Sequence, residues 1–281
     1  MPVVSEIVES YKNFLMVKYP AHLGPFCKRL RNNRESARAE AVTFSLLRPI
    51  VEEITIAEDV VEGGVDFLCS NTDVKFIVEV TSLESEAVAA QSRWPNTIAE
   101  DGTGGSFGMI THMLRTKASD KASQLSGYEM ARVLVIACEH IAADVLLGPL
   151  EAEMFLTSET KIAVPISAGK PIDPKVYLTT DLKDSVFFRF KNGILEPCRK
   201  SISVVILLSV LGDKCLAVGI LHPDPQHVFS IGLLPSVPFL RMKRWPPENH
   251  HIETEWVIHS PKQAEFNHCN VVLKDKELGD T

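Results

Sequence analysis

The segments GGVDFLC (residues 63–69) and KFIVEVTSL (residues 75–83) decide the fold, because both are rich in β-branched and aromatic residues. The polar residues 70–73 between them are typical of a tight turn. We therefore expect the two segments to form the central antiparallel hairpin of a β-sheet. Each strand of such a hairpin presents alternate residues to one face of the sheet.

The position of the turn determines which residues of the hairpin lie opposite one another. A turn centred on residues 71–72 places Asp66 opposite Ile77. Glu79 is then the diagonal neighbour of Asp66, and Thr81 lies on the same face. Diagonal positions are close enough for two carboxylates to hold one ion.

The rest of the chain alternates between helical and strand-like patterns. Apolar residues at helical spacing or in continuous runs predict helices over about residues 5–19, 34–48, 109–124 and 139–156 and strands over residues 52–60, 131–138, 202–212 and 214–222. The last helix is expected to be interrupted at Gly148-Pro149, and the last two strands to form a hairpin. This order predicts an α/β fold with a mixed central β-sheet flanked by helices on both faces.

The long connection over residues 84–108 is expected to be a functional loop, because connections of this length are uncommon in compact domains. We expect residues 1–140 to form a core together with the N-terminal helices. Residues 141–281 are expected to form a C-terminal extension, which either packs on the same sheet or forms a small β-rich subdomain.

Three acidic residues are predicted to converge on one site. Glu79 lies in an otherwise apolar strand, where an ionised carboxylate is costly unless it is paired or metal-bound. Glu40 lies on the apolar face of its predicted helix and is expected to point inward, toward Asp66 and Glu79. Such a group suits Mg²⁺ or Mn²⁺. The alternative is that each acid pairs with a nearby Lys or Arg.

The order of short motifs resembles the PD-(D/E)XK nuclease superfamily, most closely its RecB-like branch. The chain has Gly-Gly-Val-Asp at residues 63–66, Glu-Val-Thr at residues 79–81 and Gln-Leu-Ser-Gly-Tyr at residues 124–128, with Glu40 upstream. The resemblance covers roughly residues 34–138 and implies a restriction-endonuclease-like core with the order α-β-β-β-α-β.

The resemblance also implies roles for individual residues. Asp66 and Glu79 would bind the metal, with support from Glu40. Gln124 and Tyr128 would line the site and help to place the nucleic acid.

One position departs from the family pattern, because Thr81 stands where the family usually has a catalytic Lys. Thr cannot supply positive charge. Lys117, Lys121 and Gln124 lie on one stripe of the following helix, so a helix-borne Lys could substitute. Lys121 is the candidate that we include among the catalytic residues, whereas Lys117 is expected to be a solvated surface residue.

Composition narrows the class of protein. The net charge of −7 argues against a protein that coats nucleic acid through bulk charge. The six cysteines contain no C-x-x-C pair, so free thiols are expected rather than a zinc cluster. The N-terminus lacks the features of a secretory signal and no apolar run is long enough to span a bilayer. We therefore expect a cytoplasmic protein that does not associate with membranes.

These observations leave three hypotheses of function. The first is a Mg²⁺- or Mn²⁺-dependent nuclease acting on DNA. The second is a catalytically degenerate nuclease-like module that binds nucleic acid or a protein partner, which Thr81 favours. The third is an interaction protein whose apolar second half forms a homodimer surface.

Overall fold

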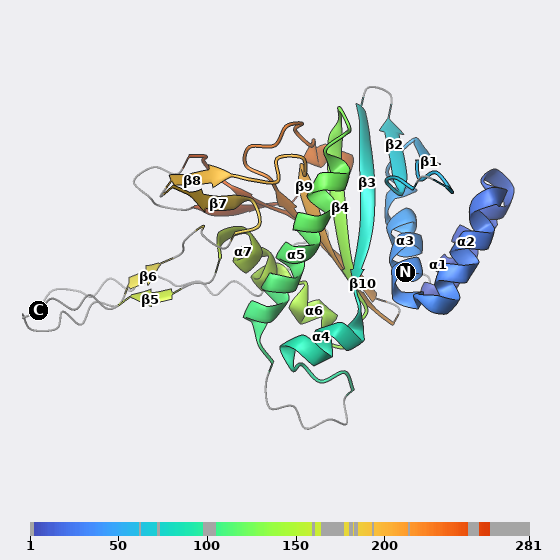
Figure 1. Cartoon of the computed structure of the whole chain (residues 1–281). Coiled ribbons are helices and arrows are strands. Elements are labelled where there is room, and N and C mark those ends of the chain that lie inside the picture. The colour runs from blue at the N-terminus through green and yellow to red at the C-terminus, as the bar shows by residue number, and fades with distance from the viewer. Residues whose placement is uncertain are drawn as a thin grey trace, which may run out of the picture.

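The chain forms a large twisted β-sheet with helices on both sides, as the computed structural model in Figure 1 shows. The structure describes residues 3–61, 63–71, 74–97, 105–158, 161–163, 177–179, 182, 185–192, 194–212, 214–246 and 253–258. Within these residues, no helix combines the length and the apolar character needed to cross a membrane.

The large sheet has eight strands, in the order β1-β2-β3-β4-β9-β10-β11-β12. Their bounds are β1 Glu53–Ile56, β2 Phe67–Asn71, β3 Val74–Leu83, β4 Ala131–Cys138, β9 Val204–Leu211, β10 Lys214–Leu221, β11 Phe239–Met242 and β12 Thr254–Val257. Strands β1, β2 and β3 are antiparallel neighbours, whereas β3, β4 and β9 run parallel. The sheet is therefore mixed, and the α/β class predicted from the sequence is confirmed.

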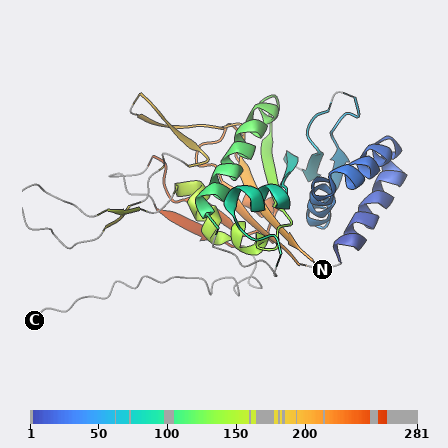
Figure 2. The same ribbon diagram turned by 60° about the horizontal axis from the view of Figure 1, so that its bottom comes forward.

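Helices cover both faces of this sheet, as the view in Figure 2 shows. One face packs against α1 (Val4–Lys18), α2 (Pro20–Asn32) and α3 (Arg34–Leu47). The other packs against α4 (Ser85–Ser92), α5 (Phe107–Leu125), α6 (Ala143–Leu146) and α7 (Pro149–Thr157). Each group of helices encloses its own apolar core.

Strand β4 explains why the sheet needs two covered faces. All eight of its residues are buried. Val133 and Val135 pack in the core beneath α1–α3, whereas Leu134 and Ile136 pack in the core beneath α5–α7. A strand buried on both faces has a continuous apolar sequence rather than an alternating one.

The interruption predicted at Gly148-Pro149 is confirmed, because α6 ends at Leu146 and α7 begins at Pro149. The predicted hairpin of the second half is also confirmed as the antiparallel pair β9–β10. Gly212 in its turn has a φ of +62°, a conformation that glycine adopts without steric cost.

Two helices were not predicted from the sequence. Helix α2 has Pro20 in its first turn and Pro25 inside it, and such prolines usually indicate breaks. Pro25 is the sixth residue of the helix, so it removes the one hydrogen bond that its N–H would have made to the carbonyl of Ala21. Helix α4 occupies part of the connection that we expected to be a long loop, and the Gly-rich part of that connection at residues 98–104 lies outside the described residues.

The second half of the chain extends the same large sheet through β9, β10, β11 and β12. The 3₁₀ helix Ile231–Leu233 precedes β11. Two further pairs of short strands are not part of the large sheet. They are β5 (Lys161–Ala163) with β6 (Tyr177–Thr179) and β7 (Phe188–Lys191) with β8 (Ile194–Pro197). Strands β4 and β9 pair directly. The expected boundary near residue 140, between the core and the C-terminal extension, therefore lies within one continuous sheet.

The packing of β4 makes a prediction about stability. Replacing the fully buried Leu134 with Ala should lower the free energy of unfolding by about 2–5 kcal/mol, because a cavity remains in a tightly packed core. Urea unfolding followed by circular dichroism measures this loss. Leu150→Ala is the matched control, since that side chain is 57% exposed and should change stability by less than about 0.5 kcal/mol.

Candidate functional site

The register of the hairpin differs from the predicted one by two residues. Asn71 pairs with Val74 and Phe67 pairs with Val78, so the turn lies one residue later than expected. Continuing this register places Asp66 level with Glu79 rather than with Ile77. A shift of two residues leaves the side chains of regular strand residues such as Glu79 on the predicted face, because strand side chains alternate with a period of two. Asp66 itself lies just before β2, where the alternation breaks, because Val65 packs in the core beneath α4–α7 and Phe67 packs in the core beneath α1–α3.

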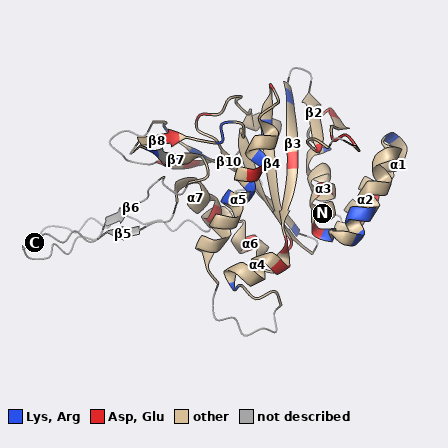
Figure 3. Ribbon diagram, in the orientation of Figure 1, with Lys and Arg blue, Asp and Glu red and all other residues tan. Residues whose placement is uncertain are grey.

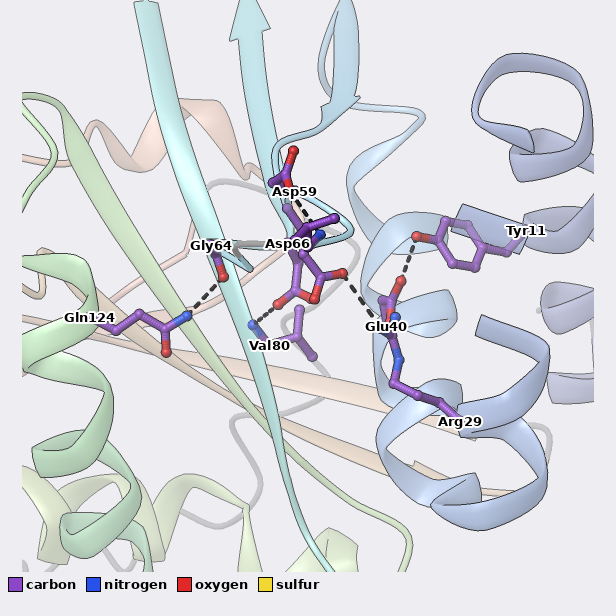
Figure 4. A network of polar contacts seen from close by, with 10 residues as sticks. Tyr11, Arg29, Glu40, Asp59, Gly64, Asp66, Val80 and Gln124 are labelled. Carbon is purple, nitrogen blue, oxygen red and sulfur yellow. Dashed lines mark hydrogen bonds and ion pairs between the residues drawn. The ribbon is translucent and has the colours of Figure 1, made fainter. Parts of the chain in front are cut away.

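Asp66 lies just before β2 begins, at the point where the regular ladder with β3 ends. The backbone N–H of Val80 donates to Oδ2 of Asp66 over 2.7 Å. The carboxylate therefore accepts the hydrogen bond that a backbone carbonyl of the neighbouring strand would otherwise accept from β3. The backbone carbonyl of Asp66 accepts from the N–H of Ala57 over 3.0 Å. Figure 4 shows Asp66 between β3 and helix α3. The chain thus fixes both the side chain and the backbone of Asp66.

Two glycines form the turn that precedes Asp66. Gly63 and Gly64 have φ values of +77° and +140°, which side chains strongly disfavour. From the opposite side, Nε2 of Gln124 donates to the carbonyl oxygen of Gly64 over 2.8 Å. The hydroxyl of Tyr128 lies 3.7 Å from where a β-carbon on Gly64 would lie. Gln124 therefore holds the turn that precedes Asp66, and Tyr128 lies beside this turn.

Glu79 is buried in β3 with only 3% of its surface exposed. Its Oε1 accepts from Nζ of Lys121 over 2.6 Å, and Lys121 also donates to Oε1 of Gln124 over 3.0 Å. The second carboxylate oxygen, Oε2, is buried without a hydrogen-bond partner within the described part of the chain. The structure thus joins Lys121 to Glu79, and leaves Glu79 with one oxygen able to accept a ligand.

Thr81 is also buried, with 9% of its surface exposed. As the second residue after Glu79 it lies on the same face of β3. The positive charge that contacts Glu79 comes from Lys121 of helix α5.

Glu40 points inward from α3, and 8% of its surface is exposed. Its Oε1 accepts from the hydroxyl of Tyr11 over 2.7 Å, and its Oε2 forms an ion pair with Arg29. Figure 4 shows these contacts converging from α1, α2 and α3. Glu40 therefore has the cationic partner that the alternative interpretation requires, and its negative charge raises the pKa of Asp66.

Asp66 has the strongest electrostatic conflict of this group. Burial raises the pKa of its carboxyl well above the usual value, and the negative charges of Glu79, Glu40 and Glu58 raise it further. The hydrogen bond from Val80 acts in the opposite direction but is outweighed. Among the described residues, no Lys or Arg forms an ion pair with Asp66.

Glu58 and Arg29 were not singled out from the sequence. Glu58 follows β1 and forms an ion pair with Arg29 over 3.5 Å. Neither residue carries a motif signal, because each reaches the site only through the packing of α2 against the β1–β2 loop. The run of basic residues from Lys28 to Arg38 was the one available indication for Arg29.

Burial also raises the pKa of Glu79 and of Glu40, although Lys121 and Arg29 oppose this effect. Several half-buried or buried carboxylates in one place favour a cation, which neutralises charge that water cannot reach. Among the described residues, no three Asp, Glu, His or Cys side chains are arranged as a ready set of metal ligands. The unpartnered Oε2 of Glu79 and the crowded carboxyl of Asp66 are nevertheless ligands of the kind that a hard divalent cation prefers.

Comparison with family models, with curated proteins and with solved structures finds no significant match to this chain.

The pKa of Asp66 makes a prediction about stability and pH. A carboxyl group with a raised pKa holds its proton more tightly in the folded than in the unfolded state, so it disfavours folding as the pH rises above about 4. Asp66→Asn should therefore raise the free energy of unfolding at pH 7 by about 0.5–2 kcal/mol. The gain should shrink as the pH is lowered toward 4.

Urea unfolding in the presence of a chelator at several pH values measures this effect. Asp224→Asn is the control, because Asp224 is half exposed and forms an ion pair with Lys200 over 2.8 Å. That substitution should bring no gain. A loss of stability for Asp66→Asn at pH 7 would mean that the fold stabilises the charged carboxylate.

Proposed function

We propose that this chain is a Mg²⁺- or Mn²⁺-dependent nuclease that hydrolyses phosphodiester bonds of DNA. Asp66 and Glu79 would hold the cation, and Glu40 would support them. The proposal rests on the crowding of carboxylates around Asp66, which raises the pKa of its carboxyl and which a bound cation would relieve. Energetically unfavourable charge clusters are typical of functional sites.

The order of elements supports the proposal. Helix α3, strands β1, β2 and β3, helix α5 and strand β4 follow the sequence α-β-β-β-α-β, apart from the short α4. The antiparallel β2–β3 pair and the parallel β3–β4 pair agree with the restriction-endonuclease-like core that the motif resemblance implies. In such a core, the motif residues would line the active site.

A divalent cation at this site would supply Lewis acidity toward a phosphoryl oxygen and would make a bound water more acidic. The chain itself would supply positive charge through Lys121, whose ammonium group lies against Glu79. Gln124 would keep Asp66 in place through its hydrogen bond to Gly64, and Tyr128 lies next to this glycine. Lys121 would thus provide the charge that Thr81 lacks.

Cleavage assays test the proposal directly. The purified chain should cut plasmid or oligonucleotide DNA in the presence of Mg²⁺ or Mn²⁺ and should be inactive with a chelator. Asp66→Ala and Glu79→Ala should each lower the rate at least about 100-fold, because metal-site residues contribute at this scale. Glu86→Ala removes an exposed acid of α4 and should leave the rate unchanged. Cleavage that survives both site substitutions would contradict the proposal.

The role of Lys121 is tested separately. Lys121→Gln should lower the rate about 100-fold, as expected when one positioned charge at a reacting group is lost. Lys117→Gln removes a positive charge from the same helix and is the matched control, with an expected change of less than threefold. Equal effects of the two substitutions would show that Lys121 contributes only general surface charge.

A second function fits one specific observation. Glu79 and Glu40 already have cationic partners in Lys121 and Arg29, and Thr81 replaces the usual Lys. A nuclease-like core with these ion pairs could bind nucleic acid or a protein partner without cutting. Calorimetry distinguishes the two functions, because the binding module would show no uptake of Mn²⁺ and would still associate with DNA.

A further inference from the structure

A second concave region lies on the side of α5 that faces the β7–β8 hairpin. The pocket has a volume of about 830 Å³, which is large enough for a nucleotide-sized ligand. Its lining combines hydroxyl-bearing residues of α5 with residues on and beside β7 and β8. Figure 3 shows positively charged positions along α5 and on β7.

The pocket carries positive charge. Arg115, Arg189 and Arg199 line it, and none of the described lining residues is Asp or Glu. Arg189 has a long contact of 3.8 Å with Glu196, and both side chains are exposed, so this ion pair holds the guanidinium only weakly. In a chain with a net charge of −7, three arginines around one pocket indicate an anionic ligand.

Arg199 is held rigidly at this site. Its backbone has a φ of +54°, which is uncommon for a residue with a side chain. The guanidinium donates to the carbonyl oxygen of Val186 over 2.6 Å and to Oγ of Ser119 over 3.0 Å. Its Nε–H is buried and has no hydrogen-bond partner within the described part of the chain. A guanidinium held in one orientation presents its fixed positive charge to the pocket, which suits a phosphate group.

Two hydroxyl groups are prepared to donate in the same pocket. Ser119 accepts from Arg199, and Ser185 accepts from the backbone N–H of Phe187 over 3.2 Å. A hydroxyl that already accepts one hydrogen bond keeps its own proton available for an acceptor. Among the described lining residues there is no acidic acceptor for these donors, which favours an anion with several oxygens.

This pocket is distinct from the carboxylate site. Its lining residues on α5, including Ser119 and Ser123, follow helical spacing along one side of the helix. Lys121 and Gln124 project from the other side, where they contact Glu79 and Gly64. The two sites share a helix but no lining residue.

From these contacts we infer that the pocket between α5 and the β7–β8 hairpin binds a phosphate group. The phosphate would belong either to a free nucleotide or to the backbone of a nucleic-acid strand. Arg199 and Arg189 provide its charge-assisted hydrogen bonds, and Ser119 and Ser185 provide neutral donors. The inference does not depend on metal binding or on nuclease activity.

Calorimetry in a low-salt, phosphate-free buffer tests this inference. A chelator is present throughout, so the carboxylate site cannot act and a failure of the proposed nuclease function leaves the result unaffected. The probes are AMP, adenosine and octathymidylate. AMP or octathymidylate should bind, and adenosine should bind at least tenfold more weakly than the better of these two ligands.

Arg199→Gln and Arg189→Gln should each weaken binding of that ligand at least tenfold. Lys75→Gln removes an exposed positive charge of β3 outside the pocket and should change the affinity less than twofold. Because Arg199 also supports the backbone at Val186, its variant is checked by circular dichroism. The exposed Arg189 gives a second test that does not depend on folding.

The two sources of phosphate give different results. Octathymidylate that binds at least tenfold more tightly than AMP, and is weakened by the same substitutions, identifies a nucleic-acid strand. AMP that binds as tightly as octathymidylate identifies a free nucleotide. Absence of binding by both ligands, or binding that Arg189→Gln and Arg199→Gln leave unchanged, overturns the inference.

Discussion

Several carboxylates crowd together where β2 separates from β3. This crowding constrains the residues that α2, α3 and α5 place around Asp66. Asp66 replaces a backbone carbonyl at the edge of β3, and Glu79 is buried beside it. Isolated charges in such surroundings are costly, so the neighbouring elements supply compensation. Helix α5 supplies Lys121 to Glu79, and α2 supplies Arg29 to Glu40. Asp66 receives no such partner among the described residues, which makes it the centre of the site.

The sequence predicted this arrangement in part, because it depends on local periodicity. Alternation along β3 placed Glu79 and Thr81 on one face, and helical spacing placed Glu40 inward. The register was wrong by two residues, since a polar segment at residues 70–73 does not specify which pair closes the turn. Residues within the strands kept their faces because this error was an even number of residues, whereas Asp66, just before β2, departs from the regular alternation.

The partners of the acids could not be predicted in the same way. Arg29 lies on α2, which was not predicted because the helix contains two prolines. The contact of Arg29 with Glu58 forms only when α2 packs near the β1–β2 loop. Lys121 was identified as a candidate by its spacing from Gln124, but its contact with Glu79 depends on how α5 crosses β3. Local patterns give the direction of a side chain, whereas the choice of partner is a property of the tertiary packing. Helix α5 illustrates this, because its two sides face different chemical environments.

The pairing of β4 with β9 has a consequence for dividing the chain. Six residue pairs join these strands, from Val133–Val204 to Cys138–Ser209. A fragment ending near residue 140 would contain the motif residues but would expose the whole apolar edge of β4. Open apolar edges recruit strands from other molecules. Such a fragment would therefore tend to aggregate. A shortened version of the protein would have to retain β9 to remain monodisperse.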